Sequence, residues 1–185
     1  PDNVLITGAA SAADVEQELG LMFARLDNAL ESRESQLQIL QSMLSDKKLK
    51  SERTVAGRPV LKGWMSSEYG MRTDPFSGGS RWHAGVDFAG RQGSDVIAVA
   101  SGVVTWSSER SGYGNMVEIN HSDGFVTRYA HNEANIADLG AIVKKGDLIA
   151  KMGSSGRSTG PHVHFEVYKN GRTVDPASYI KRTSR

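Results

Sequence analysis

Hydrophobic residues recur at alternating steps of three and four along the first quarter of the chain. Between residues 12 and 49 there is no proline and Gly20 is the only glycine. The recurring positions are Leu19, Phe23, Leu26, Leu30, Leu37, Leu40 and Leu44. With Phe23 at heptad position a, apolar residues fill the a and d sites except at Arg33, which is typical of a coiled-coil helix. We therefore predict a coiled-coil-type helical segment within residues 1–50, which pairs with another helix or packs on its own domain.

The pattern changes at about Trp64, where glycine becomes frequent and short runs of β-branched or aromatic residues begin. Each run is bounded by Gly, Asn, Asp or Ser, as short strands are. The runs lie at 96–100, 102–106, 116–119, 125–129 and 164–168. They predict a mainly β domain over residues 64–180. Residues 51–63 are basic and contain Gly57 and Pro59, so we expect a linker there, and a short tail at 181–185.

Composition narrows the classes of function. The 185 residues carry 22 Lys and Arg against 21 Asp and Glu, so no overall positive field favours nucleic acid. There is no cysteine, which excludes disulfides, thiolate nucleophiles and cysteine metal sites. No apolar run approaches the roughly 18 residues of a membrane-spanning helix. The chain begins at Pro1 rather than Met, so we expect a processed or trimmed protein, and the sequence does not show whether a signal peptide or membrane anchor was removed.

Candidate chemistry gathers around the histidines, all five of which lie between residues 83 and 164. His162 and His164 follow a Gly/Ser-rich loop and are two apart in a predicted strand, so both leave the sheet on one side. His83 and Asp87 are four apart around Gly85. A catalytic zinc takes three His or carboxylate ligands and leaves a position for water. His83, Asp87 and one of His162 and His164 would complete that set, and the spacing alone does not choose between the two.

A further histidine ends the alternating run from Thr127 to His131. Alternation predicts that Thr127, Tyr129 and His131 share a face, where Tyr129 either packs in the core or contacts substrate. Imidazoles that do not bind metal suit general acid and base work. We expect a structural role for His121, and for Glu166 a hydrogen bond to a ligand rather than a ligand role.

Three motifs occur in one order: His83-x-x-x-Asp87, Thr127-x-Tyr129-x-His131, and the run from Ser158 to Glu166 that contains His162-x-His164. Together they resemble the LytM/lysostaphin-type zinc peptidases of peptidase family M23, over roughly residues 64–180. The resemblance implies an antiparallel β fold with an open groove.

The resemblance also implies roles for the site residues. The metal Zn²⁺ would be held by His83, Asp87 and His164. His131 and His162 would be catalytic, as base and oxyanion stabiliser. We expect substrate-binding contacts from Tyr129, Ser158 and Thr159.

The function that this resemblance implies is hydrolysis of peptide cross-links in bacterial peptidoglycan by a zinc-activated water. The alternative is a catalytically silent module that binds or activates other cell-wall hydrolases. We expect location in the cell envelope, in the periplasm with or without a membrane anchor, and the extracellular space is the alternative. The N-terminal helix is expected to form a homodimer or to bind a membrane or divisome protein, and no nucleic acid partner is expected.

Overall fold

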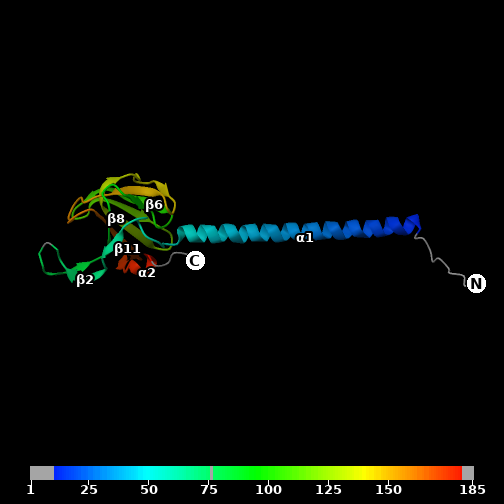
Figure 1. The fold of residues 1–185 in the computed structure, drawn as a ribbon, viewed down its shortest axis with the longest axis horizontal. Coiled ribbons are helices and arrows are strands. Elements are labelled where there is room, and N and C mark those ends of the chain that lie inside the picture. Colours follow the sequence, from blue (N-terminus) through cyan, green and yellow to red (C-terminus); the bar gives the residue numbers. More distant parts are fainter. Residues whose placement is uncertain (1–10, 76, 181–185) are drawn as a thin grey trace, which may run out of the picture. The chain divides into compact units, whose positions relative to one another are not determined.

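The computed structural model describes residues 11–75 and 77–180, and the tail expected at 181–185 lies outside them. The chain divides into a helical unit, Pro1–Lys48, and a β unit, Leu49–Arg185. The expected fold class is confirmed, because an N-terminal helix precedes a mainly antiparallel β-sheet (Figure 1).

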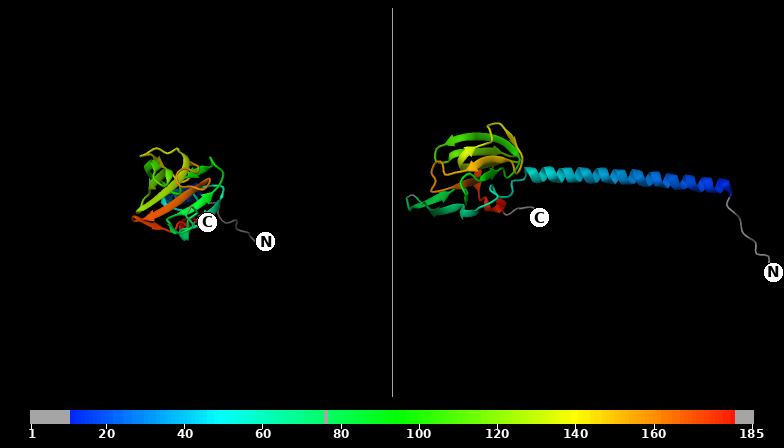
Figure 2. Two further views of the ribbon diagram at one scale, coloured as in Figure 1. Left: turned by 90° about the vertical axis from the view of Figure 1, so that its left-hand side faces the viewer. Right: turned by 45° about the horizontal axis from the view of Figure 1, so that its top comes forward.

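The helix α1 runs from Ala12 to Arg53 without a buried residue. It begins with a reciprocal cap, in which Asp14 Oδ2 accepts the Ser11 backbone N–H at 3.1 Å and Asp14 N–H donates to Ser11 Oγ at 3.3 Å. At its end, the Thr54 N–H donates a hydrogen bond to the Lys50 carbonyl at 3.0 Å. The right-hand view of Figure 2 shows α1 as one continuous helix.

The strands of the β unit are short and joined by turns. They are β1 Trp64–Ser67, β2 Gly70–Thr73, β3 Ser80–His83, β4 Val86–Ala89, β5 Asp95–Ile97, β6 Gly102–Arg110, β7 Gly114–Asn120, β8 Phe125–Asn135, β9 Ile142–Val143, β10 Leu148–Met152, β11 His162–Lys169 and β12 Arg172–Val174. A short helix α2, Ala177–Ile180, follows β12. Among the described residues, ten strands form one sheet with the path β1-β4-β11-β8-β7-β6-β9, and β2 pairs with β3 apart from it.

Two hairpin turns use residues that tolerate positive φ. Asp123 and Gly124 have φ of 60° and 72° between β7 and β8. Asn170 and Gly171 have φ of 51° and 79° between β11 and β12. Both pairs suit type I′ turns, which require positive φ at both central positions.

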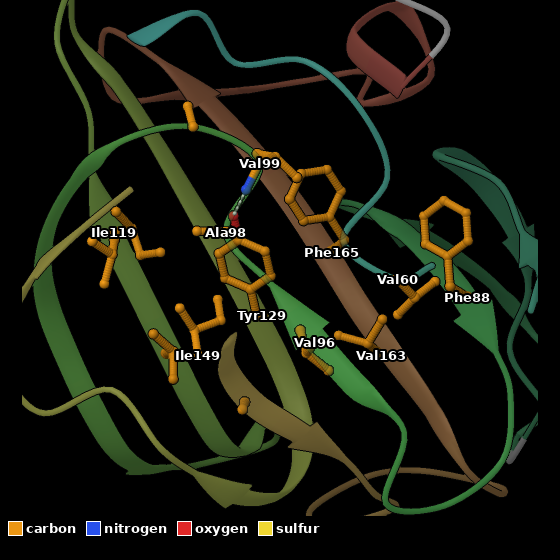
Figure 3. Packing of buried hydrophobic residues seen from close by; sticks show 14 of the residues in the cluster. Val60, Phe88, Val96, Ala98, Val99, Ile119, Tyr129, Ile149, Val163 and Phe165 are labelled. Carbon is orange, nitrogen blue, oxygen red and sulfur yellow. Dashed lines mark hydrogen bonds between the residues drawn. The ribbon is translucent and has the colours of Figure 1, made fainter. Parts of the chain in front are cut away.

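Strand β11 separates the core from the site. Val163, Phe165 and Val167 are fully buried among apolar neighbours, whereas His162, His164 and Glu166 alternate with them and face the other way. Phe165 is paired across the sheet with Tyr129 on β8, and the two rings lie 5.3 Å apart in the core (Figure 3). The apolar face of the strand thus packs in the core and fixes the position of the face that carries the histidines.

The segment expected as a linker, residues 51–63, packs on the β unit instead. Val55 and Val60 are each 2% exposed and belong to the hydrophobic core. The Pro59 carbonyl accepts the Ile97 N–H at 2.8 Å, and the Val99 carbonyl accepts the Ala56 N–H at 3.4 Å. The linker prediction was wrong for this stretch because its few apolar residues cover the sheet while its basic residues stay at the surface.

Candidate metal centre

An open pocket of about 270 Å³ lies on the face of the sheet opposite the core. Strand β11 contributes His162, His164 and Glu166 to its lining. The neighbouring strands and loops contribute Arg72, Asp74, Pro75, Arg81, Trp82, His83, Ala84, Asp87, Ser111, Gly112, Tyr113, His131, Arg157, Ser158 and Thr159. This pocket corresponds to the groove that the sequence predicts.

Three side chains converge at the floor of the pocket. His83 Nε2 lies 3.0 Å from His164 Nδ1 and 3.2 Å from Asp87 Oδ1, and His164 Nδ1 lies 2.8 Å from Asp87 Oδ1. The three residues are 5–7% exposed. The antiparallel pairing of β4 with β11 sets this arrangement, because it places Asp87 directly opposite His164.

Gly85 makes room for the cluster. A Cβ at this position would lie 3.0 Å from His164 Cε1 and closer still to the Phe165 carbonyl oxygen. A side chain here would therefore displace His164 or the β11 backbone, which gives a reason for glycine between His83 and Asp87.

The remaining nitrogens of both histidines are held by acceptors. His83 Nδ1 donates to the Glu68 carbonyl at 2.6 Å, which leaves the Nε2 lone pair directed at the cluster. His164 Nε2 donates to Glu166 Oε1 at 3.1 Å, which leaves Nδ1 for the cluster. Such outer hydrogen bonds fix the tautomer and orientation of metal-binding histidines.

The donor set fits a zinc ion. Two neutral imidazole nitrogens and one carboxylate oxygen are the ligand types of a catalytic zinc site. Bonds of about 2.0–2.1 Å in a tetrahedral arrangement put neighbouring ligand atoms roughly 3.3 Å apart. The separations of 2.8–3.2 Å come close to that value, and the pocket leaves one side of the cluster open.

Charges within the cluster are mutually dependent. Burial alone would raise the pKa of Asp87, but the close contacts of its carboxylate with His164 and His83 outweigh it and hold that pKa well below its usual range. Burial lowers the pKa of His164, whereas its hydrogen bonds to Asp87 and Glu166 raise it to about 9. A proton on His164 thus compensates the carboxylates, and a divalent cation would replace that proton on binding.

His131 reaches the pocket through a local break in strand β8. The expectation that Tyr129 and His131 share a face was wrong. Tyr129 pairs with Phe165 on the core side, whereas the His131 ring lies 4.8 Å from His162 and 5.9 Å from His164. His131 has a φ of 64°, which interrupts the alternation and turns its side chain toward the site.

The protonation of His131 is set by its surroundings. Its Nδ1 donates to the Ser155 carbonyl at 2.8 Å, so Nε2 presents a lone pair. Burial lowers the pKa of His131 to about 4, although its hydrogen bond to the Ser155 carbonyl acts in the opposite direction. His131 is therefore neutral near pH 7.

His162 lies beside the cluster but outside the set of three ligand atoms. Its Nδ1 donates to the Gly160 carbonyl at 2.7 Å, and its Nε2 lies 3.8 Å from Asp87 Oδ1. Ser158 Oγ lies 3.1 Å from His162 Nδ1, so this hydroxyl helps to hold the ring. Ser158 and Thr159 both line the pocket.

Tyr129 does not reach the pocket, which contradicts the expected substrate contact. It is 0% exposed, and its hydroxyl accepts the Val99 N–H at 3.1 Å (Figure 3). The same hydroxyl lies 3.0 Å from Thr127 Oγ1, which lies 2.7 Å from His121 Nε2. His121 ends this buried chain by donating from Nδ1 to the Ser101 carbonyl at 2.9 Å, which confirms a structural role for His121.

Several pocket residues were not among the predicted site residues, and two of them contact the candidate ligands or their support. Arg72 donates to Asp87 Oδ2 at 3.3 Å, and the Tyr113 hydroxyl donates to Glu166 Oε1 at 3.1 Å. Glu166 is 1% exposed and also accepts the Tyr168 hydroxyl at 3.0 Å, so it supports His164 as expected. The only sequence signal for Tyr113 is an aromatic residue between Gly112 and Gly114.

Comparison with known proteins agrees with this geometry. The chain is 42% identical over 120 residues to DD-carboxypeptidase/endopeptidase Mpg of Neisseria meningitidis serogroup B, covering 65% of this chain and 28% of that protein. It is 35% identical over 121 residues to the murein hydrolase activator NlpD of Escherichia coli K12, covering 65% of this chain and 32% of that protein. The chain thus spans about a third or less of the length of these two relatives.

Solved structures share the fold of the β unit. A zinc-containing peptidase from Vibrio cholerae matches with a TM-score of 0.62 and 36% identity, over 67% of this chain and 39% of that chain. The catalytic domain of lysostaphin from Staphylococcus simulans matches with a TM-score of 0.59 and 31% identity, over 64% of this chain and 92% of that chain. The profile described as peptidase family M23 matches residues 81–176, more than half of the 185 residues. The chain belongs to peptidase family M23.

Proposed function

We propose that this protein is a zinc-dependent endopeptidase that hydrolyses peptide cross-links of bacterial peptidoglycan. The observation that carries the proposal is the convergence of His83 Nε2, Asp87 Oδ1 and His164 Nδ1 within 3.2 Å of one another at the floor of an open pocket. Two further histidines, His131 and His162, lie beside this cluster and are not among its three ligand groups.

His83, Asp87 and His164 would hold the zinc. A zinc ion in such a site lowers the pKa of a coordinated water to about 7 and polarises a carbonyl group. The outer contacts of Glu68, Glu166 and Arg72 keep the three ligands oriented.

The two other histidines would move and hold protons. His131 is neutral and presents the Nε2 lone pair, so it suits the general base that takes a proton from the attacking water. His162 presents Nε2 toward Asp87 and would donate from this atom, when protonated, to the developing oxyanion or the leaving amine. Ser158 and Gly160 hold its other nitrogen in place.

The names of relatives support this substrate class. Mpg is named a DD-carboxypeptidase/endopeptidase, and ShyC of Vibrio cholerae, 38% identical over 109 residues, is named a peptidoglycan DD-endopeptidase. These names favour direct cross-links between D-amino acids over glycine bridges for this chain.

A cell-envelope location, in the periplasm, agrees with this substrate. The outer membrane antigenic lipoprotein B of Haemophilus influenzae is 38% identical over 120 residues, and its name places it in the envelope. Within residues 11–75 and 77–180, no helix combines the length and apolar character that a membrane crossing needs.

A second candidate is a silent module that activates other cell-wall hydrolases, which the similarity to NlpD favours. The complete set of His83, Asp87, His131, His162 and His164 argues for catalysis instead. Zinc content discriminates the two, because an activator has no need of a metal.

The test is hydrolysis of purified peptidoglycan with product analysis. Zinc-loaded protein should release cross-link cleavage products, and a chelator or Asp87→Asn should abolish the reaction. Asp95→Asn is the matched control, since Asp95 is exposed outside the pocket and pairs with Lys151. Full activity in metal-free or Asp87→Asn protein would exclude the proposed reaction, and a zinc-free wild type that stimulates another hydrolase would favour the activator.

A further inference from the structure

Three arginine side chains line the pocket beside the candidate metal centre. Arg72 lies on β2, Arg81 on β3 and Arg157 on the loop before β11. Their side chains are 36%, 56% and 42% exposed, so all three guanidinium groups are reachable from the groove. Arg72 is engaged with the candidate ligand Asp87, whereas Arg81 and Arg157 are both engaged with Asp74.

A buried carboxylate holds this pair together. Asp74 is 5% exposed, and both of its oxygens accept from Arg157 Nη2, at 2.9 and 2.7 Å. Asp74 Oδ2 also accepts from Arg81 Nη1 at 3.3 Å. One carboxylate therefore orients two guanidinium groups that come from segments far apart in the chain.

The backbone around this cluster is also fixed. Asp74 N–H donates to the Gly79 carbonyl at 2.7 Å, which closes the β2–β3 hairpin. Arg157 N–H donates to the Gly112 carbonyl at 3.1 Å, which ties the loop to the β6–β7 turn. The two arginines are therefore positioned before any ligand arrives, which lowers the entropy cost of binding.

The charge balance favours an anionic ligand. The three arginines of the pocket face three carboxylates, those of Asp74, Asp87 and Glu166. Of these carboxylates, Glu166 is buried and already pairs with Arg128, whose Nη1 lies 3.5 Å from Glu166 Oε2. Arg128 itself does not line the pocket. A divalent cation on His83, Asp87 and His164 would therefore make the pocket cationic overall.

We propose that Arg81 and Arg157, aligned by Asp74, form a subsite for a free carboxylate of the substrate peptide close to the scissile bond. A guanidinium presents a planar fork of donors that matches a carboxylate, and it stays charged at every physiological pH. This inference rests on the proposed function and names its substrate class. The preferred peptides carry a free carboxylate near the cleaved bond, as D-alanyl-D-alanine ends do, and neutral glycine bridges lack this group.

The test compares two ligands that differ only in this charge. An N-acetyl D-alanyl-D-alanine analogue with a ketomethylene link in place of the amide bond resists hydrolysis, so its binding is measured independently of turnover. The free acid and the C-terminal carboxamide are each titrated by calorimetry into zinc-loaded full-length protein. We expect the acid to bind about tenfold more tightly than the carboxamide, as a charge-assisted contact predicts.

Variants assign this preference to the arginines. In Arg81→Gln and in Arg157→Gln, the preference for the acid should fall toward unity, with zinc content unchanged. Arg172→Gln is the matched control, because Arg172 is exposed on β12 and outside the pocket, and it should keep the full preference. If Arg157→Gln does not fold, Arg81→Gln decides, since its side chain is the more exposed of the pair.

Two results would overturn the subsite. One is equal binding of acid and carboxamide by the wild type. The other is a preference that persists in both arginine variants, because the carboxylate would then sit on the metal. A protein that prefers the acid but hydrolyses no peptidoglycan would refute the proposed function and leave the subsite standing, and a hydrolase without the preference would do the reverse.

Discussion

His83 Nε2 and His164 Nδ1 lie 3.0 Å apart although 81 positions separate the two residues in the chain. The contact spans two strand systems, since His83 ends β3 and His164 lies in β11. Asp87, on β4, is the bridge, because its backbone pairs with β11 opposite His164 while its side chain meets His83. The β4–β11 register thus places Asp87 opposite His164, and the side chain of Asp87 meets His83 from the separate β2–β3 pair.

The first prediction concerns metal removal. Zinc bound to the folded β unit and not to the unfolded chain should stabilise it, by about 2.7 kcal/mol when free zinc exceeds the Kd 100-fold. Chelation should lower the Tm measured by circular dichroism, and added zinc should restore it. Asp87→Asn should remove this response and Asp95→Asn should keep it. If neither zinc nor chelator changes the Tm, the result would argue against a metal at this site.

The second prediction concerns Glu166, which accepts the His164 Nε2–H at 3.1 Å. Glu166→Gln removes the charge that orients and polarises this imidazole, so zinc affinity should fall about tenfold or more. Competition with a calibrated chelator measures the affinity. Glu118→Gln is the control, because Glu118 also pairs with Arg128, at 2.7 Å, but does not contact His164. Equal loss in both variants would show that the effect comes from Arg128 instead.

The third prediction separates core from groove at Tyr129. Tyr129→Phe leaves the Val99 N–H without its acceptor and disturbs Thr127, so stability should fall by about 1–3 kcal/mol. The kcat/KM of the zinc-loaded folded protein should stay unchanged, because the hydroxyl does not reach the pocket. Denaturant unfolding and peptide hydrolysis give the two readings. A selective rise in KM with unchanged stability would restore Tyr129 as a substrate contact.

The fourth prediction concerns stability at low pH. Burial lowers the pKa of His121 below its ordinary value of 6.5, so the unfolded chain binds this proton more readily than the folded protein. The free energy of unfolding should therefore decrease as pH falls from 6.5 toward the folded pKa, and be independent of this group above 6.5.

The measurement is urea unfolding between pH 5 and 7.5 in chelator, which removes the contribution of bound metal. His121→Asn lowers stability at every pH, but its curve should lack the part of the acid slope that His121 supplies. Parallel curves for wild type and variant would contradict the assignment.

The fifth prediction concerns the apolar stripe of α1. Each of its seven large residues is more than half exposed: Leu19, Phe23, Leu26, Leu30, Leu37, Leu40 and Leu44. Pairing with a second copy would bury this stripe, so light scattering should give the mass of a dimer for the full chain and of a monomer for residues 49–185. A monomeric full chain would favour a membrane or divisome protein as the partner of the helix. A higher rate of hydrolysis by residues 49–185 than by the full chain would favour autoinhibition, in which the helix covers the groove.

The sequence predicted the parts of the site with a short-range pattern. Alternation along β11 placed His162, His164 and Glu166 on one face, and the His83-x-x-x-Asp87 motif supplied the other donors. Heptad spacing predicted α1, and the hairpin turns at Asp123 and Asn170 use residue types that tolerate positive φ. Each of these follows from side-chain periodicity or backbone preference within a few residues.

Other features depended on contacts between distant segments. Alternation wrongly placed Tyr129 and His131 on one face, because the positive φ of His131 interrupts the alternation of side chains at this point. His131 is held in this conformation by hydrogen bonds to the Tyr113 and Ser155 carbonyls. Nothing near Arg157 in the chain indicates that Asp74, 83 positions away, would align it with Arg81. The local sequence determined which side chains of a strand lie on the same face and can therefore reach the pocket. The tertiary structure decided which of them meet, because register and burial fix distances that no local spacing contains.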